Sequence, residues 1–254
     1  MRKLLKEIIK AELYKFYKKK YLVSLLCLNL LPLLYGMGAY FKWKIVLIGA
    51  KLDLITFATS MWSFTVMLTI PLILLLFIAA TTLGGEINEG QMLLEVTRIE
   101  HKKTLIVGKA LAILIMCMLF YITNIICSIC TYIVFLSRTD KGYSSIFVTH
   151  NYNLESIFVS IASLLFICFL LMTTFYLSMN SGVIVATLSG MGIYLLCMLL
   201  AYIPGVSEFI PGYFTVVANY KFTSSRVIFQ YVELSFLCSS LIFLTVKQFE
   251  KKEY

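Results

Sequence analysis

Charged side chains are scarce in this chain of 254 residues. Only 14% of the residues are Asp, Glu, Lys or Arg, whereas 60% are hydrophobic. An ordinary soluble domain carries about 25% charged residues. The shortage excludes a soluble globular domain, and the composition indicates a membrane protein that crosses the bilayer several times.

Acidic residues are scarcer than basic ones, so the formal net charge is +9. A charge of this size could attract nucleic acid, but the basic residues lie at the chain ends and between apolar runs. They do not form one patch with interleaved aromatic residues, as a nucleic-acid surface would. We therefore expect no nucleic-acid partner and assign the basic residues to membrane topology.

Motifs for catalysis and for ATP binding are missing. The chain has no Gly-x-x-x-x-Gly-Lys-Ser/Thr phosphate loop and no Gly-x-Ser-x-Gly elbow. Its seven cysteines, an odd number, all lie within apolar runs, and the Cys127-x-x-Cys130 pair is flanked by isoleucines. We expect no catalytic residue, no bound cofactor, no disulfide framework and no ATP hydrolysis by the chain itself.

Residues 1–20 form the basic start of the chain. Apolar residues recur there every three or four positions, eight of the residues are Lys or Arg, and two are Glu. This pattern predicts a basic amphipathic helix that lies in the bilayer interface on the anionic cytoplasmic leaflet. A solvated charged leader is the alternative.

Six apolar segments follow, each close to or above the roughly 20 residues that an α-helix needs to cross the hydrocarbon. They predict one all-α transmembrane domain over residues 1–254. We expect a kink at Pro71, and we expect the first turn of the third span, with Gly108 and Lys109, to protrude into the interface. The predicted spans are residues 21–40, 57–83, 105–136, 156–179, 183–203 and 227–246.

The distribution of Lys and Arg predicts the orientation. With the amino terminus inside, the cytoplasmic segments hold 15 of these residues and the outer loops hold seven. The positive-inside rule then places both termini and residues 84–104 in the cytoplasm, and residues 204–226 outside. His101 and His150 lie on opposite sides in this topology, so we expect no metal site.

The outer segment from Pro204 to Phe214 is rich in aromatic residues and contains two Pro-Gly pairs. Phe209, Tyr213 and Phe214 are too apolar for a freely solvated loop. We predict a short re-entrant or interfacial cap. A loop whose aromatic rings rest in the headgroup belt is equally compatible with the sequence.

Glu233 is the exception in spans that otherwise contain almost no ionisable residue. It lies with Gln230 about two turns in from the outer end of the sixth span. Glu233 either faces a polar cavity on a translocation path, to which Gln230 and the aromatic residues of the cap would also belong, or pairs with a basic group such as Arg226. A carboxylate that merely lies near the interface is the alternative.

The fifth span repeats small residues every four positions, at Gly182, Ala186 and Gly190. In lipid such a stripe permits close approach of another helix. We predict that it packs against a helix of a second subunit or against a helix of the same chain.

Residues 84–104 are a long polar interruption between two apolar spans. Met92, Leu93 and Leu94 offer an apolar anchor, and the flanking acids can pair with a basic surface of a partner. A solvated helix without a partner is the alternative.

This segment reads Glu86-x-Asn88-Glu89-Gly90-x-x-Leu93-Leu94, and Lys102, Lys103 and the Gly108-Lys109 pair follow it. Together with the basic leader and the six spans, the pattern resembles the membrane subunits of ABC-2 type transporters. Gln91 stands where that family usually has threonine, and no arginine precedes Glu86, so the subfamily stays open.

The resemblance implies a permease subunit that works with a second permease subunit, identical or different, and with separate cytoplasmic ABC ATPase subunits. Those ATPase subunits would bind the ATP and Mg. In that family the helix after the second span sits in a groove of the ATPase and transmits its closure. The implied ATPase-coupling residues are Glu86, Asn88, Glu89, Gly90, Gln91, Met92, Leu93 and Glu95.

The small size, short outer loops and lysine-rich composition resemble the lantibiotic-immunity and peptide-export permeases of small Gram-positive bacteria. That resemblance implies a multi-pass protein of the bacterial cell membrane that exports an amphipathic or hydrophobic substrate, foremost a peptide. Export of a lipid or hydrophobic drug, and a membrane assembly or sensor protein that transports nothing, are the alternatives.

Overall fold

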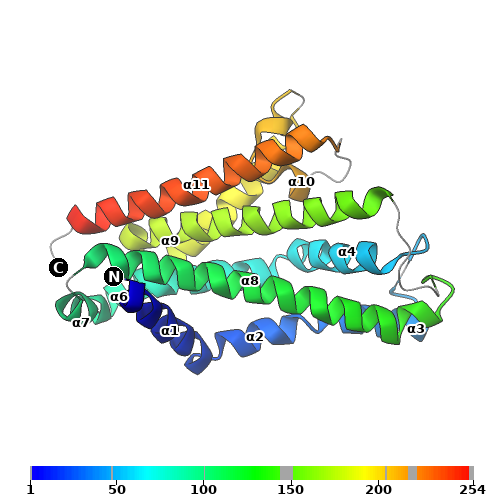
Figure 1. The fold of residues 1–254 in the computed structure, drawn as a ribbon, viewed down its shortest axis with the longest axis horizontal. Coiled ribbons are helices and arrows are strands. Elements are labelled where there is room, and N and C mark those ends of the chain that lie inside the picture. Colours follow the sequence, from blue (N-terminus) through cyan, green and yellow to red (C-terminus); the bar gives the residue numbers. More distant parts are fainter. Residues whose placement is uncertain are drawn as a thin grey trace.

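The computed structural model describes residues 2–46, 48–99, 101–143, 151–203, 205–216 and 222–251, and most of these residues are helical. His150 and Pro204 lie outside them. Within the described residues, the one strand-like contact is an isolated bridge between Leu52 and Gly142. The long helices run along the long axis of the molecule, and α1 begins at the end where α11 finishes (Figure 1). The predicted all-α architecture is confirmed.

The amino-terminal part comprises α1 (Arg2–Lys18), α2 (Tyr21–Leu28) and α3 (Leu31–Tyr40). Lys20 adopts a left-handed backbone conformation with a φ of 60° between α1 and α2. The chain therefore turns there, and α1 lies oblique to the axis of the bundle (Figure 1). Helices α2 and α3 together form an apolar stretch long enough to cross a membrane, at the place of the predicted first span.

The predicted second span is two helices instead of one. Helix α4 (Leu54–Met67) ends and α5 (Ile70–Ala80) begins on either side of Thr69, whose φ is 59°. The expected kink at Pro71 is thus a break just before that residue. A proline fits the first turn of a new helix because its missing N–H would have no helical partner there.

Helix α5 continues through the π-helical turn η1 (Thr81–Gly85) into the short α6 (Glu86–Asn88). Gly90 has a φ of 73°, a left-handed conformation that favours glycine, and it reverses the chain into α7 (Gln91–Arg98). Helix α8 (Lys102–Val134) then runs the length of the molecule and ends in the turn η2 (Leu136–Arg138).

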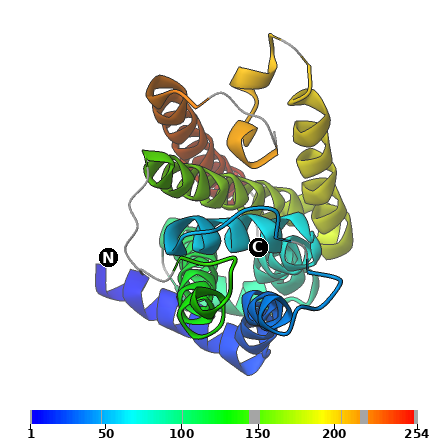
Figure 2. The ribbon, with the colours of Figure 1, turned by 90° about the vertical axis from the view of Figure 1, so that its right-hand side faces the viewer.

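Helix α9 (Asn151–Leu200) contains the predicted fourth and fifth spans. At Gly182 the backbone leaves the helical conformation, with a φ of 73° and a ψ of 172°. Residues 151–181 and 183–200 diverge from this bend as two arms (Figures 1 and 2). The turn expected at Asn180-Ser181 therefore lies one residue later, at a glycine that accepts the positive φ.

The carboxy-terminal part comprises η3 (Ser207–Phe209), α10 (Tyr213–Val216) and α11 (Ser224–Lys251). The segment with η3 and α10 lies between the second arm of α9 and α11 (Figure 2). The predicted cap thus packs beside the helices of its own chain.

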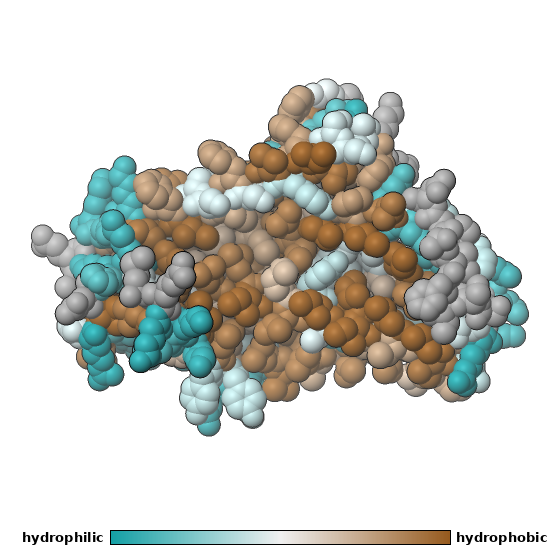
Figure 3. Space-filling view, viewed as in Figure 1, coloured by the Kyte–Doolittle hydropathy of each residue, from teal (hydrophilic) through white to brown (hydrophobic). Residues whose placement is uncertain are grey.

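The main core forms among α5, α8 and α9, where Leu75, Ile113 and Phe175 are fully buried. Apolar side chains also cover the flank of the molecule, and polar ones gather at its two ends (Figure 3). Such a surface suits a bilayer, which replaces water around the flank. The molecule is therefore a membrane-embedded protein.

Five stretches of the described chain are long and apolar enough to cross a membrane, whereas six spans are predicted. Two of the predicted spans are the arms of α9, which count as one stretch, so the number of crossings depends on the bend at Gly182. The five stretches are Tyr21–Tyr40, Ile70–Asn88, Lys102–Arg138, Tyr152–Leu200 and Ser224–Lys251.

Candidate functional site

A buried group of charged side chains lies at the end of the molecule that holds both termini. It consists of Glu12 and Lys15 from α1, Glu86 from α6, Glu95 from α7 and Lys109 from α8. We call these five residues the ionic cluster. They join four helices that are up to 97 residues apart in the sequence.

Lys109 lies in the centre of the ionic cluster, and its side chain has no exposed surface. Its Nζ lies 2.8 Å from Glu12 Oε1 and 2.8 Å from Glu95 Oε2, and it also donates to Glu86 Oε2. All three carboxylates therefore meet at one ammonium group, which offsets part of their negative charge.

Lys15 contacts the same three carboxylates from the half-exposed side of the cluster. Its Nζ donates to Glu12 Oε1 at 2.8 Å, to Glu86 Oε1 at 2.7 Å and to Glu95 Oε1 at 2.5 Å. Because Glu86 and Glu95 each pair with both lysines, the segment that contains α6 and α7 is held to α1 and α8 at once.

Helix α1 contributes Glu12 to the cluster because its buried face contains this carboxylate between two apolar residues. Ile8, Glu12 and Phe16 follow each other at intervals of four residues and are all buried. A Cβ atom on Gly108 would lie 2.5 Å from the Ile8 side chain, so the glycine lets α1 approach α8 closely. Lys109, the next residue, then reaches the carboxylate of Glu12.

Two glycines and a π-helical turn position the remaining carboxylates. A Cβ atom on Gly84 would lie 2.5 Å from the carbonyl oxygen of Ser178, so η1 packs directly on the backbone of α9. A π-helical turn changes the direction of the residues that follow it, and Glu86 comes directly after it. The left-handed turn at Gly90 then folds α7 back so that Glu95 meets Glu86.

Electrostatics keeps the cluster charged. Burial lowers the pKa of Lys15, but the charge of Glu12 and the hydrogen bonds to its three carboxylate partners outweigh that effect and raise the pKa well above its usual range. Burial raises the pKa of Glu95, but its contacts with Lys109 and Lys15 prevail and lower it. Both groups are therefore ionised near neutral pH.

The three carboxylates also have the spacing of a cation site, since Glu12, Glu86 and Glu95 each offer an oxygen within 4.8 Å of the others. The ammonium groups of Lys15 and Lys109 already supply the positive charge at this position. The arrangement is therefore a salt-bridge network that can join helices.

The eight predicted coupling residues divide between two faces of the segment 86–95. Glu86 and Glu95 point into the ionic cluster, and Met92 is 1% exposed in the core. The outward face carries Asn88, Glu89, Gly90, Gln91 and Leu93, with Leu94 beside them. Gln91 Nε2 donates to Glu89 Oε2 at 2.7 Å on this exposed face.

Three members of the ionic cluster were not expected from the sequence. Lys109 is fully buried, so the prediction that it protrudes into the interface is wrong, because three carboxylates from other helices replace the solvent around it. The sequence contains one indication that Glu12 is buried, because Glu12 lies midway between Ile8 and Phe16 on the apolar face of the helix. Lys15 follows Glu12 at helical i,i+3 spacing, but its partner Glu86 lies 71 residues away and has no local signal.

Gln230 fixes the cap to α11. Its side chain is 1% exposed, its Oε1 accepts from the Gly212 N–H at 3.2 Å, and its Nε2 donates to the Ile210 carbonyl at 3.1 Å. The same Nε2 donates to Glu233 Oε2 at 3.0 Å. Arg226, considered as a partner of Glu233, instead pairs with Glu208 at 2.6 Å, because the cap brings Glu208 closer.

The aromatic residues of the cap have different surroundings. Tyr213 and Phe214 are buried with Val159 of α9, whereas Phe209 is 63% exposed and meets the ring of Phe229 edge-on. The first two therefore fasten the cap to the bundle.

The stripe of small residues in α9 faces the interior of the same chain. Ala186 is fully buried, and a Cβ atom on Gly190 would lie 2.1 Å from Thr174 Oγ1 on the other arm of α9. Gly182 forms the bend itself. In this fold the three residues let the two arms of α9 pack closely.

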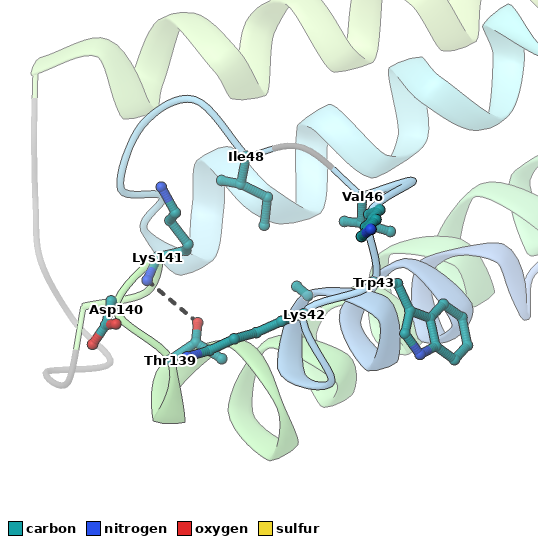
Figure 4. A pocket seen from close by; sticks show the side chains of 9 residues that line it. Lys42, Trp43, Val46, Ile48, Thr139, Asp140 and Lys141 are labelled. Atoms are coloured by element: carbon teal, nitrogen blue, oxygen red, sulfur yellow. Dashed lines mark hydrogen bonds between the residues drawn. The ribbon is translucent and has the colours of Figure 1, made fainter.

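A cavity of about 320 Å³ lies at the opposite end of the molecule, where α3 and η2 end. Lysine side chains surround it without meeting at one point, and the Lys141 backbone N–H donates to Thr139 Oγ1 at 3.3 Å (Figure 4). The lining residues are Ala39, Lys42, Trp43, Lys44, Val46, Ile48, Thr139, Asp140 and Lys141.

The fold and the ionic cluster define an all-α membrane protein in which buried salt bridges join a polar segment to the bundle. The sequence matches no family model, and no curated protein is significantly similar to it.

Proposed function

We propose that this chain is the membrane-spanning permease subunit of an ABC-2 type exporter in a bacterial cell membrane. A separate cytoplasmic ABC ATPase would bind ATP and Mg and would act on the segment 86–95. The chain would work with a second permease subunit and would export an amphipathic or hydrophobic substrate, foremost a peptide. Both termini would lie in the cytoplasm.

One observation supports this proposal beyond the resemblance of the motif. The segment 86–95 presents Glu89, Leu93 and Leu94 to solvent, and Leu93 and Leu94 are 48% and 60% exposed. Its other face is fixed by Glu86 and Glu95 to α1 and α8. A partner that pushes on the outward face would therefore move α1 and α8 directly, because salt bridges and not a flexible loop connect the segment to them.

The ionic cluster gives the proposed coupling a physical basis. Separation of a carboxylate from a buried ammonium group is costly because it leaves a charge uncompensated, so Glu86 and Glu95 are held close to Lys109. Movement of Glu86 and Glu95 would then require movement of Lys109, and with it the amino-terminal end of α8. Lys15 would carry the same movement to α1.

The test is capture of a cytoplasmic ABC ATPase by the purified chain, combined with measurement of ATP hydrolysis by the complex. The double variant Glu89→Lys, Leu93→Asp changes only the outward face. We expect it to reduce capture by roughly thirtyfold, since loss of one anchor in a protein interface costs about 2 kcal/mol. The control Lys44→Glu, Ile45→Asp makes similar changes at the opposite end, where Ile45 is 92% exposed.

The control should capture the ATPase like the unaltered chain. Equal capture by the Glu89 and Leu93 variant and by the control would reject the assignment of the coupling face. A chain that captures no ATPase at all would contradict the transporter proposal.

A further inference from the structure

Helix α1 has two faces of different chemistry. Its buried face carries Ile8, Glu12 and Phe16 and packs on α8. The opposite face is polar or aromatic except for Ala11, and its residues recur every three or four positions, so they form one stripe along the helix. The exposed residues of α1 are Lys3, Lys6, Glu7, Lys10, Ala11, Tyr14, Tyr17 and Lys18.

The stripe is strongly basic. It holds four lysines against one glutamate, and the exposed Lys19 and Lys20 follow directly. Lys18 Nζ lies 5.4 Å from the centre of the Tyr14 ring. Among the described residues, Lys3, Lys6 and Lys10 form no ion pair, so their charge is available to a partner outside the chain.

The stripe also has an aromatic end. Tyr14 and Tyr17 are 59% and 60% exposed, and they lie where α1 leads into α2, the start of the first apolar stretch. Tyrosine is favoured at the level of the lipid headgroups because its ring is apolar and its hydroxyl is polar. In Figure 3 polar and pale side chains project from the molecule where the polar end meets the apolar flank, beside the position of α1.

We infer that this exposed stripe of α1 binds the anionic headgroups of the leaflet at the end of the molecule that holds the ionic cluster. The charge of the stripe is complementary to such a surface, and its tyrosine end is continuous with the apolar flank. An acidic soluble protein could pair with the lysines. It would not offer the two tyrosines a boundary between polar and apolar surroundings.

Lipid binding at this face stabilises the ionic cluster. Glu12 and Lys15 lie on the buried face of the same helix, so a membrane that immobilises α1 also immobilises the partners of Glu86 and Glu95. The segment 86–95 is then fixed more firmly in a membrane with anionic lipid than in one without it. This inference concerns the chain alone and does not require an ATPase.

The experiment compares the full chain in nanodiscs of zwitterionic phosphatidylcholine with nanodiscs that also contain anionic phosphatidylglycerol. Amide hydrogen exchange is measured in residues 2–18 and 91–98. A single lysine near an anionic surface favours binding by roughly fivefold, so we expect anionic lipid to slow exchange in α1 by at least about fivefold. Slower exchange in α7 should accompany it.

Three variants make the result specific. Replacement of Lys3, Lys6, Lys10 and Lys18 by Gln should abolish the difference between the two membranes, whereas replacement of the same residues by Arg should retain it. The Gln variant of four exposed lysines at the opposite end is the matched control and should behave like the unaltered chain; these are Lys42, Lys44, Lys51 and Lys141.

Equal exchange in the two membranes would overturn the inference. A lipid effect that persists when the α1 lysines are Gln would also overturn it, as would slower exchange with soluble polyglutamate but not with phosphatidylglycerol. Failure to capture an ATPase would leave this result unchanged, so the inference and the proposed function can fail separately.

Discussion

At the scale of single residues, the fully buried ammonium group of Lys109 governs the stability of the cluster. Replacement of Lys109 by Met would leave Glu12, Glu86 and Glu95 with Lys15 alone. Because loss of one partner leaves a buried charge uncompensated, we expect the free energy of unfolding to fall by about 3 kcal/mol. Thermal unfolding of the purified protein in detergent measures this change.

The control for Lys109 is Lys103, six residues earlier on the same helix. Its side chain is 70% exposed and lies 3.5 Å from Glu250, a surface pair of the kind that contributes little. Replacement of Lys103 by Met should change stability by less than about 1 kcal/mol. Adding Glu86→Gln to Lys109→Met should recover part of the loss, and similar melting temperatures for all three variants would contradict the buried network.

At the scale of elements, the hydropathy of the sequence located most of the helices. The stretches 21–40 and 105–136 correspond to α2 with α3 and to α8, because a long apolar run in this composition has few other structures available. The break at Thr69 was not foreseen, since a left-handed conformation of a threonine depends on its surroundings. The ionic cluster was not foreseen because the pairs that join its helices, such as Glu12 with Lys109 and Lys15 with Glu86, lie 97 and 71 residues apart in the sequence.

The turn at Gly90 offers a prediction at this scale. Its φ of 73° is costly for an L residue, although a Cβ atom there would meet nothing within 4 Å. Replacement of Gly90 by Ala should therefore weaken the folding-back of α7 by about 1 kcal/mol through the backbone alone. Faster hydrogen exchange in residues 91–98 would show this effect.

Gly85 provides the matched control for the turn. It has a helical φ of −62°, and a Cβ atom there would make ordinary contacts, the nearest at 3.5 Å. Gly85→Ala should leave exchange in α7 unchanged. If both alanine variants exchange alike, the left-handed turn does not determine the position of α7.

At the scale of the whole molecule, function depends on which end faces the cytoplasm. The end with α1, α6, α7 and the carboxy terminus of α11 also holds the ionic cluster, and the opposite end holds the loops around residues 41–53 and 139–142 (Figure 1). Lys and Arg are concentrated on the first of these sides, so the positive-inside rule predicts that this side faces the cytoplasm. In that orientation an ATPase could reach the outward face of the segment 86–95, and the anionic cytoplasmic leaflet could reach the exposed stripe of α1.

Reporter fusions test this orientation. Green fluorescent protein fused after Tyr254 should fluoresce, and alkaline phosphatase fused there should be inactive, because the former matures in the cytoplasm and the latter only outside it. Phosphatase inserted between Asp140 and Lys141 should be active. The opposite pattern would put the ionic cluster and the segment 86–95 outside the cell, beyond the reach of any cytoplasmic ATPase, and the transporter proposal would fail with the topology.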